Sequence, residues 1–252
     1  MTEDEPVRVE RDGDITLVTL DRPERRNALN SAAARGLADA IAGAEDARAI
    51  VLTGAGGAFC AGGDLDELER WSDLEPDVIA DKLYAAYQGM ILAIRSSSAI
   101  VIAAVDGPAV GAGLDLALAC DLRIASTRAR FGQVWVRLGV IPGTGGAWLT
   151  QALIGPTRAA QMLLTGELVD AEQALQWGLV NEVVEPNDLL DRARALAQKI
   201  LAHPRDGVVA NKRAIVKATE AQLDAALEHA RLVQPQRFTS DEFRAALKKA
   251  RR

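Results

Sequence analysis

Up to Pro186, the chain alternates between short apolar runs and longer segments with helical spacing. The apolar runs are bounded by turn residues, which indicates strands. The segments between them place apolar residues three and four positions apart, which indicates amphipathic helices. The expected strands are residues 15–20, 48–53, 99–105, 122–125 and 179–184, and the expected helices are residues 31–44, 64–70, 76–95, 112–119 and 147–154. Strands and helices in alternation predict an α/β fold.

The chain changes character near its end. From Asp170, which we expect to cap a helix, the sequence is mostly helical apart from the short strand at 179–184, and after Pro186 nearly every segment favours a helix. We therefore expect an α/β core over residues 1–190 that carries the ligand site, followed by a helical region over residues 191–252.

Composition and charge narrow the classes of function. The chain has 252 residues, of which 49% are hydrophobic, and its net charge is −6. It therefore has ample material for a core, and it has no general positive field that would attract nucleic acid. Two cysteines cannot build a disulfide framework, and the acidic N-terminal residues lack the pattern of a signal peptide. The longest uncharged run, residues 138–157, holds Pro142, Pro156 and five glycines, so we expect a cytoplasmic protein without a membrane span.

Several familiar sites are excluded by their missing residues. Residues 53–56 follow a strand as a dinucleotide-binding turn would, but Phe59 stands where that motif needs its third glycine. No Gly-Lys-Ser/Thr string and no Gly-x-Ser-x-Gly string occurs. The only two histidines, His203 and His229, lie in the helical tail, so we expect neither a metal site nor a catalytic triad.

Two glycine-rich loops, residues 58–64 and 107–115, each follow a strand and open a helix. Small residues let a ligand approach the backbone, and an amide at a helix N-terminus lies at the positive end of the helix dipole. Two such amides that converge could stabilise the oxyanion of a thioester enolate, each by about 3 to 4 kcal/mol. The alternative is that the glycines only allow helices to pack on strands. The acidic positions that follow the first loop, residues 64, 66, 67 and 69, are expected to form a solvated helix face.

Eight segments, in order along the chain, resemble the crotonase superfamily, the enoyl-CoA hydratase/isomerase family. These segments are residues 22–29, 58–64, 103–107, 111–117, 120–121, 131–133, 138–143, and 164–166 together with 174–180. The resemblance implies a spiral of ββα repeats, with a helical C-terminal region that assembles trimers or hexamers. It also implies a coenzyme A thioester as substrate and no separate cofactor.

The resemblance assigns roles to individual residues. The oxyanion amides correspond to Gly63 and Ala112, and the acid/base position corresponds to Asp115. The basic pair at residues 25–26 resembles the segment that meets the CoA phosphates, and basic residues near the C-terminus, from 248 to 252, could add charge there from a neighbouring subunit. The positions expected to bind substrate are Arg26, Ala28, Ala61, Gly62, Asp64, Leu65, Trp135, Gly139 and Pro142.

The chain departs from the family pattern at the catalytic carboxylates. A hydratase of this family uses two glutamates, and here Asp115 occupies the first position and Trp135 the second. Each acid/base role is worth about 10²- to 10⁴-fold in rate. Aspartate also reaches about 1.5 Å less far than glutamate. A helix N-terminus would favour the charged form of Asp115, whereas an apolar pocket would raise its pKa, and the sequence does not rank these effects.

Trp135 resembles the tryptophan of aryl-CoA dehalogenases, but Gly143 replaces their nucleophilic aspartate and also the third acid of dienoyl-CoA isomerases. Trp135 could shape a narrow acyl pocket or pack in the core. Two hypotheses follow. The first is an enzyme that stabilises a thioester enolate with Asp115 as its acid/base, with hydratase, isomerase, decarboxylase or C–C hydrolase chemistry. The second is a protein of the same fold that binds acyl-CoA without turnover.

Overall fold

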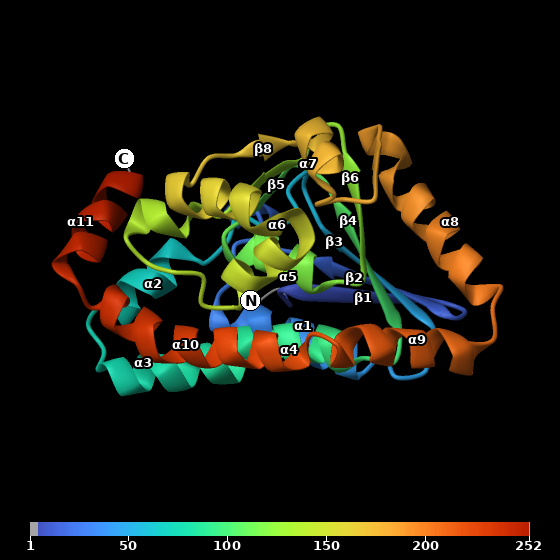
Figure 1. Ribbon diagram of the computed structural model, residues 1–252, viewed down its shortest axis with the longest axis horizontal. Coiled ribbons are helices and arrows are strands. Elements are labelled where there is room, and N and C mark those ends of the chain that lie inside the picture. Colours follow the sequence, from blue (N-terminus) through green and yellow to red (C-terminus); the bar gives the residue numbers. More distant parts are fainter. Residues whose placement is uncertain (1–4, 252) are drawn as a thin grey trace.

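Six strands form a sheet at the centre of the computed structural model, which describes residues 5–251 (Figure 1). In spatial order they are β1 (Val7–Asp12), β2 (Ile15–Leu20), β3 (Ala49–Gly54), β4 (Ile100–Val105), β6 (Leu122–Ser126) and β9 (Glu182–Val184). β1 and β2 are antiparallel, and the other neighbours are parallel. The five expected strands are therefore present, although β9 is shorter than residues 179–184. β1 was not expected from the sequence, because only Val7 of its six residues is buried.

Helices cover both faces of this sheet, which explains the uninterrupted apolar runs. In β3, Ile50 and Leu52 contribute to the larger core, whereas Ala49 and Val51 contribute to a smaller core. The smaller core lies under the helix α8 (Leu189–Leu201), which packs on β3 and β4.

A second sheet has three short strands and lies beside the glycine loops. Its order is β5 (Pro108–Val110), β7 (Arg130–Gly132) and β8 (Val169–Asp170). None of these was expected, because strands of two or three residues are too short to show a period. Isolated bridges join Leu29 to Gly63 and Cys60 to Ala109, so backbone pairing holds the two glycine loops together.

The remaining elements are helices. They are α1 (Ser31–Ala42), α2 (Leu65–Trp71), α3 (Pro76–Lys82), α4 (Gly89–Ser96), α5 (Ala112–Ala119), α6 (Gly146–Thr165), α7 (Ala171–Trp177), α9 (Arg205–Lys217), α10 (Glu220–Phe238) and α11 (Asp241–Ala250), with 3-10 turns η1 (Pro23–Arg25), η3 (Val134–Leu138) and η4 (Pro186–Asp188). Between α3 and α4 the expected helix continues as a π-helical segment, η2 (Leu83–Gln88). Asp170 caps α7 as expected. Helix α1 is capped by the side chain of Asn30, and Ser31 is its first helical residue.

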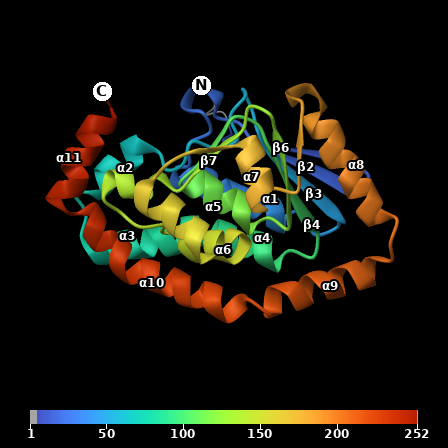
Figure 2. The same ribbon diagram turned by 45° about the horizontal axis from the view of Figure 1, so that its top comes forward.

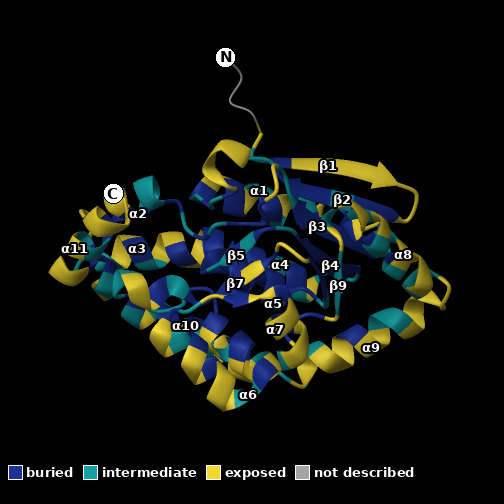
Figure 3. Ribbon diagram, turned by 90° about the horizontal axis from the view of Figure 1, so that it is seen from above, coloured by how far each residue is buried: buried dark blue, intermediate teal, exposed yellow. Residues whose placement is uncertain are grey.

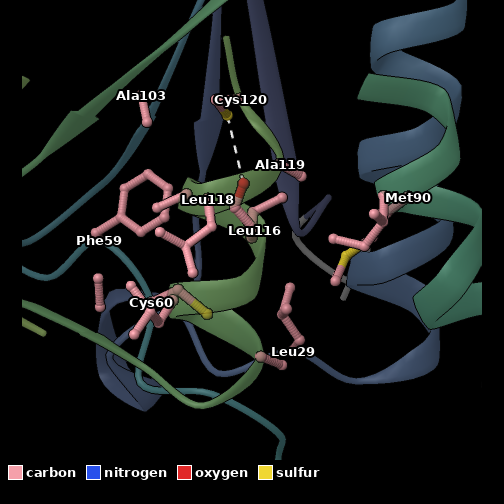
Figure 4. Packing of buried hydrophobic residues seen from close by; sticks show 14 of the residues in the cluster. Leu29, Phe59, Cys60, Met90, Ala103, Leu116, Leu118, Ala119 and Cys120 are labelled. Carbon is pink, nitrogen blue, oxygen red and sulfur yellow. Dashed lines mark hydrogen bonds between the residues drawn. The ribbon is translucent and has the colours of Figure 1, made fainter. Parts of the chain in front are cut away.

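Helix α5 is buried along its whole length and lies in the interior of Figure 3. Cys60 and Cys120 pack around it, and the Cys120 thiol donates a hydrogen bond of 3.4 Å to the Leu116 carbonyl oxygen (Figure 4). Burial raises the pKa of both thiols to about 12, so they are protonated at neutral pH. Both cysteines are therefore small buried core residues.

The last helices wrap around the core. α9 and α10 run one after the other along one side of the molecule (Figure 2), and α11 returns to α2, where Phe238, Phe243 and Trp71 meet edge to face. α9 is fixed by the buried Lys212, whose ammonium donates to Asp121 at 2.7 Å. None of the helices described is long and apolar enough to cross a membrane. A boundary between two regions at residue 190 stays a prediction.

Candidate active site

A pocket of about 350 Å³ opens between the loop before α1 and the start of α2. Five of the expected substrate positions line it together with the expected oxyanion residue Gly63, and these five are Arg26, Ala28, Ala61, Asp64 and Leu65. Arg251, just after α11, lies at the same pocket and pairs with Asp66 and Glu69 of α2. The basic C-terminal end thus reaches the pocket of its own chain, whereas the sequence suggested that of a neighbour.

The wall of this pocket has an unusual backbone that Asn27 holds in place. Arg26 and Asn27 have φ values of 49° and 57°, a left-handed conformation that is uncommon outside glycine. The buried Asn27 amide donates to the Ala55 and Ala58 carbonyl oxygens, at 2.8 and 2.6 Å, and its side-chain oxygen accepts from the Arg22 amide at 2.9 Å. Asn27 therefore links the loop before α1 to the first glycine loop by hydrogen bonds.

Asp64 connects the same wall to α2. Its carboxylate caps α2 by accepting from the Asp66 and Glu67 amides, and it also accepts from Arg22 at 3.0 Å. Burial would raise the pKa of Asp64, but the Arg22 guanidinium and the cap amides together lower it. Glu67 in turn accepts from the Tyr87 hydroxyl at 2.6 Å. The expectation of a solvated acidic face is therefore wrong for Asp64 and Glu67, because folding places cationic and polar donors against them.

The two expected oxyanion donors lie on segments that touch each other. The Leu29 backbone bonds to Gly62 and Asp64, both at 2.7 Å, so that Gly63 turns its own N–H to the opposite side. A Cβ placed on Gly62 would lie 2.9 Å from the Val110 carbonyl oxygen and 3.8 Å from the Ala112 nitrogen. Only a glycine fits this approach, at a φ of 96°.

Asp115 lies in the same helix as Ala112, three residues further on, and hence on the same face. Its side chain is fully buried, and its carboxylate accepts from the Thr144 hydroxyl at 2.5 Å and from the Gln133 amide at 2.7 Å. A Cβ on Gly146 would lie 1.9 Å from its Oδ1 atom. The absence of a side chain there makes room for the carboxylate.

The sequence left open whether the helix N-terminus or burial dominates the pKa of Asp115, and in the structure burial dominates. Burial raises the pKa of its carboxyl to about 6, and the hydrogen bonds from Thr144 and Gln133 offset only part of that rise. An acid with such a pKa exchanges its proton readily near neutral pH, as an acid/base group requires.

Trp135 is also buried, and it packs across the backbone just before Ala112. Its exposed fraction is 7%, and its ring reaches within 3.5 Å of a Cβ placed on Gly111. Its indole N–H interacts with the Asp115 carboxylate and opposes the rise that burial causes in the pKa of that carboxyl, although no hydrogen bond of ordinary geometry joins the two among residues 5–251.

Gly139 and Pro142 do not join the pocket that Arg26 lines. They belong to the loop between η3 and α6, which also carries Thr144. Gln234 accepts from the Ile141 amide and Gln88 donates to the Gly143 carbonyl oxygen, both at 3.0 Å. Thr144 of this loop contacts Asp115, whereas Gly139 and Pro142 are half-buried. The expected site residues thus fall into an outer pocket and an inner, buried group of Ala112, Asp115 and Trp135.

Sequence reasoning missed three residues that shape this site: Arg22, Asn27 and Thr144. Asn27 lies inside a segment that carried the family resemblance, residues 22–29, and this placement was the available signal. Thr144 contacts Asp115 across 29 residues of chain, and no spacing rule marks such a contact.

Comparisons with known proteins agree with this architecture. The family model described as enoyl-CoA hydratase/isomerase matches residues 10–250. The short-chain-enoyl-CoA hydratase of Clostridium acetobutylicum is 36% identical over 87% of this chain and 84% of its own length. The probable enoyl-CoA hydratase echA14 of Mycobacterium tuberculosis is 39% identical over 98% of each chain.

A crystal structure of an enoyl-CoA hydratase/isomerase from Mycobacterium paratuberculosis superposes with a TM-score of 0.91 at 32% identity, covering 99% of this chain and 100% of that one. The two sheets and the C-terminal helices thus form the crotonase-like α/β fold that the sequence resemblance implied. The chain belongs to the enoyl-CoA hydratase/isomerase family.

Proposed function

We propose that this protein is an enzyme that binds an acyl-CoA thioester and catalyses hydration of its α,β double bond. The Gly63 and Ala112 amides stabilise the thioester oxygen as it gains negative charge, and Asp115 transfers the proton. The observation that carries the proposal is the buried Asp115 carboxyl, with a pKa of about 6, on the same helix face as Ala112. The names of the similar hydratases support the same reaction class.

A single carboxyl can complete this reaction. The Asp115 carboxylate accepts a proton from water while the water oxygen bonds to the β carbon, and the π electrons move to the thioester oxygen as an enolate. The two amides hold that enolate, each amide being worth about 3 to 4 kcal/mol. Asp115 then returns the proton to the α carbon, so that one water is added and the carboxylate is regenerated.

The outer pocket suits the CoA portion of the substrate. Arg25 pairs with Asp66 at 3.0 Å, whereas Arg26 has no carboxylate within ion-pair distance in the described part of the chain. A guanidinium in this position can pair with a phosphate group. The Arg26 side chain therefore supplies the binding charge, and the inner group supplies the chemistry.

Crotonyl-CoA tests the proposal directly. The wild-type protein should remove the enone absorbance, and Asp115→Asn should lower that rate at least 100-fold while CoA affinity stays the same. Asp191→Asn, at a solvated position, is the matched control and should keep full activity. Undiminished hydration by Asp115→Asn would remove Asp115 from the mechanism.

The pH profile gives a second test. Because the hydration base must be ionised and burial raises the pKa of Asp115 to about 6, the rate with limiting crotonyl-CoA should fall as the pH drops through about 6. A profile that stays flat down to pH 5 would contradict this assignment.

A second candidate is a protein that binds acyl-CoA without turnover. It is favoured by Trp135 at the place of the second family carboxylate and by the complete burial of Asp115. Such a protein would bind crotonyl-CoA without loss of the enone absorbance. In deuterated water it would also leave the α carbon of butyryl-CoA without deuterium.

A further inference from the structure

The π-helical turn η2, between α3 and α4, carries two adjacent buried residues, Tyr87 and Gln88. Their exposed fractions are 3% and 1%, and each contacts a different part of the candidate site. Neighbouring side chains on a helix diverge by roughly a quarter of a turn, so one turn can reach two walls at once. π-helical turns are rare and are frequent at functional sites. The two contacts therefore indicate a functional reason for this turn.

Tyr87 supports the segment that pairs with the first glycine loop. Its hydroxyl oxygen lies 2.9 Å from the Leu29 carbonyl oxygen and 2.6 Å from the Glu67 carboxylate, so its single hydrogen is shared between two acceptors. Glu67 also accepts from the Ser31 amide at 2.8 Å, which restrains the same segment two residues further on. Burial and the charge of Glu67 raise the pKa of Tyr87 well above its ordinary value, so this donor keeps its proton near neutral pH.

Leu29 passes this restraint to the expected oxyanion donor Gly63. The Leu29 amide donates to the Gly62 carbonyl oxygen, and the Leu29 carbonyl oxygen accepts from the Asp64 amide, both at 2.7 Å. Gly63 lies between these two bonds and opposite Leu29, so a displacement of Leu29 would turn the Gly63 amide as well. Tyr87 therefore limits how far the Gly63 N–H can swing out of position.

Gln88 supports the loop that carries Thr144. Its amide donates to the Gly143 carbonyl oxygen at 3.0 Å and to the Leu227 carbonyl oxygen of α10 at 2.9 Å. Thr144, the next residue along the chain, donates to the Asp115 carboxylate. Burial raises the pKa of Asp115 to about 6, and the bond from Thr144 opposes that rise. Gln88 thus holds the residue next to a contact that governs the ionisation of the acid.

We propose that Tyr87 and Gln88 are positioning residues, each acting through the backbone on one part of the catalytic site. This inference rests on the proposed function. Tyr87 holds the Gly63 amide where it can stabilise the thioester oxygen, and Gln88 holds the Thr144 hydroxyl against Asp115. The two effects are separable, because loss of the first weakens polarisation of the thioester and loss of the second shifts the ionisation of the acid.

Turnover tests the role of Tyr87. Tyr87→Phe keeps the ring, which packs edge to face on Trp71, and removes only the hydroxyl. Because a displacement of about 1 Å can cost about 100-fold, a smaller shift of the amide should lower kcat for crotonyl-CoA hydration about 10-fold with little change in KM. Tyr84→Phe, at the exposed tyrosine of the same π-helical turn, is the matched control and should keep the wild-type kcat.

The infrared band of the thioester carbonyl reports the oxyanion donors without turnover. In butyryl-CoA that is isotope-labelled at the carbonyl carbon, binding to the wild type should move this band to lower frequency, because two amides polarise the C=O bond. Since Gly63 supplies one of the two donors, Tyr87→Phe should lose up to about half of that shift, whereas Tyr84→Phe and Gln88→Met should keep it. A Tyr87→Phe protein that is less stable but keeps the full shift and the wild-type kcat would show a purely structural residue and overturn its role.

The pH profile tests the role of Gln88. Gln88→Met keeps the length of the side chain but removes its donor, so the bond from Thr144 to Asp115 should weaken. The fall of the hydration rate at low pH should then lie about 0.5 to 1 pH unit higher than in the wild type, while Tyr87→Phe keeps the wild-type profile. An unshifted profile would overturn the role of Gln88. If Gln88→Met does not fold, Gln88→Asn, whose amide is one methylene shorter, gives the same test.

The outcomes separate this inference from the proposed function. A wild type that hydrates crotonyl-CoA, with Tyr87→Phe and Gln88→Met both indistinguishable from Tyr84→Phe, would keep the function and overturn the positioning roles. A wild type that shifts the carbonyl band without hydration would end the proposed function and the role of Gln88, and a reduced shift in Tyr87→Phe would still support the role of Tyr87. A wild type that causes no band shift would overturn the oxyanion site together with its support.

Discussion

Replacing Asp115 by asparagine should change how the stability of the protein depends on pH. The substitution keeps the size of the side chain and removes its titration. Burial raises the pKa of the wild-type carboxyl from 3.8 to about 6, so the folded state binds this proton more tightly than the unfolded state does. The stabilisation from the protonated group is therefore complete below pH 3.8 and is lost as the pH rises through about 6.

The shift sets the expected magnitude. At 1.36 kcal/mol for each pKa unit, the free energy of unfolding of the wild type, relative to Asp115→Asn, should fall by about 2 to 3 kcal/mol between pH 4 and pH 7. Asparagine should thus be relatively more favourable at neutral pH, because it avoids a buried charge.

Urea unfolding followed by circular dichroism at a fixed protein concentration measures this difference at each pH. Other titrating groups are common to both proteins, so their effects cancel in the comparison. A difference that stays constant within about 0.5 kcal/mol from pH 4 to pH 7 would show that Asp115 is not desolvated, and the reasoning about its acid/base role would fail with it.

Two further substitutions test other contacts. Gly146→Ala places a Cβ 1.9 Å from Asp115 Oδ1, so the carboxylate must move by more than 1 Å and hydration should fall about 100-fold. Gly207→Ala, where a Cβ meets nothing within 4 Å, is the control and should leave the rate unchanged. Equal hydration rates for the two variants would contradict the geometry. Lys212→Met leaves the Asp121 carboxylate without its buried partner, so the free energy of unfolding measured in urea titrations should fall by about 3 kcal/mol. A loss below about 0.5 kcal/mol would show that the ion pair does not anchor α9.

The elements that the sequence predicted are those with a strong one-dimensional signal. β3 and β4 are buried on both faces and read as continuous apolar runs, and helix α5 begins directly after a glycine loop. β1 carries one buried residue in six, so its place depends on backbone pairing with β2 and not on side-chain pattern.

In the candidate site, too, the sequence predicted the residues that share a motif and not those that meet only through the fold. Motifs along the chain predicted that residues near Gly63 would gather, and the outer pocket brings six of them together. The sequence could not reveal that Thr144 and Gln133 bond to Asp115, because each contact joins separate loops across the core. Nor could it assign Asp64 and Glu67 to buried partners, since an acidic run at the start of a helix looks the same whether or not Arg22 and Tyr87 fold against it.

The two left-handed residues at Arg26 and Asn27 have a consequence for affinity. Their conformation is unfavourable by about 1 kcal/mol or more each, and the Asn27 side-chain bonds hold it in the folded protein. A ligand therefore meets a wall that is already in its final shape and loses little binding energy to ordering it. Replacing Asn27 by glycine would remove the side-chain bonds that hold this turn, leave the Arg26 guanidinium in place, and yet weaken binding through conformational entropy.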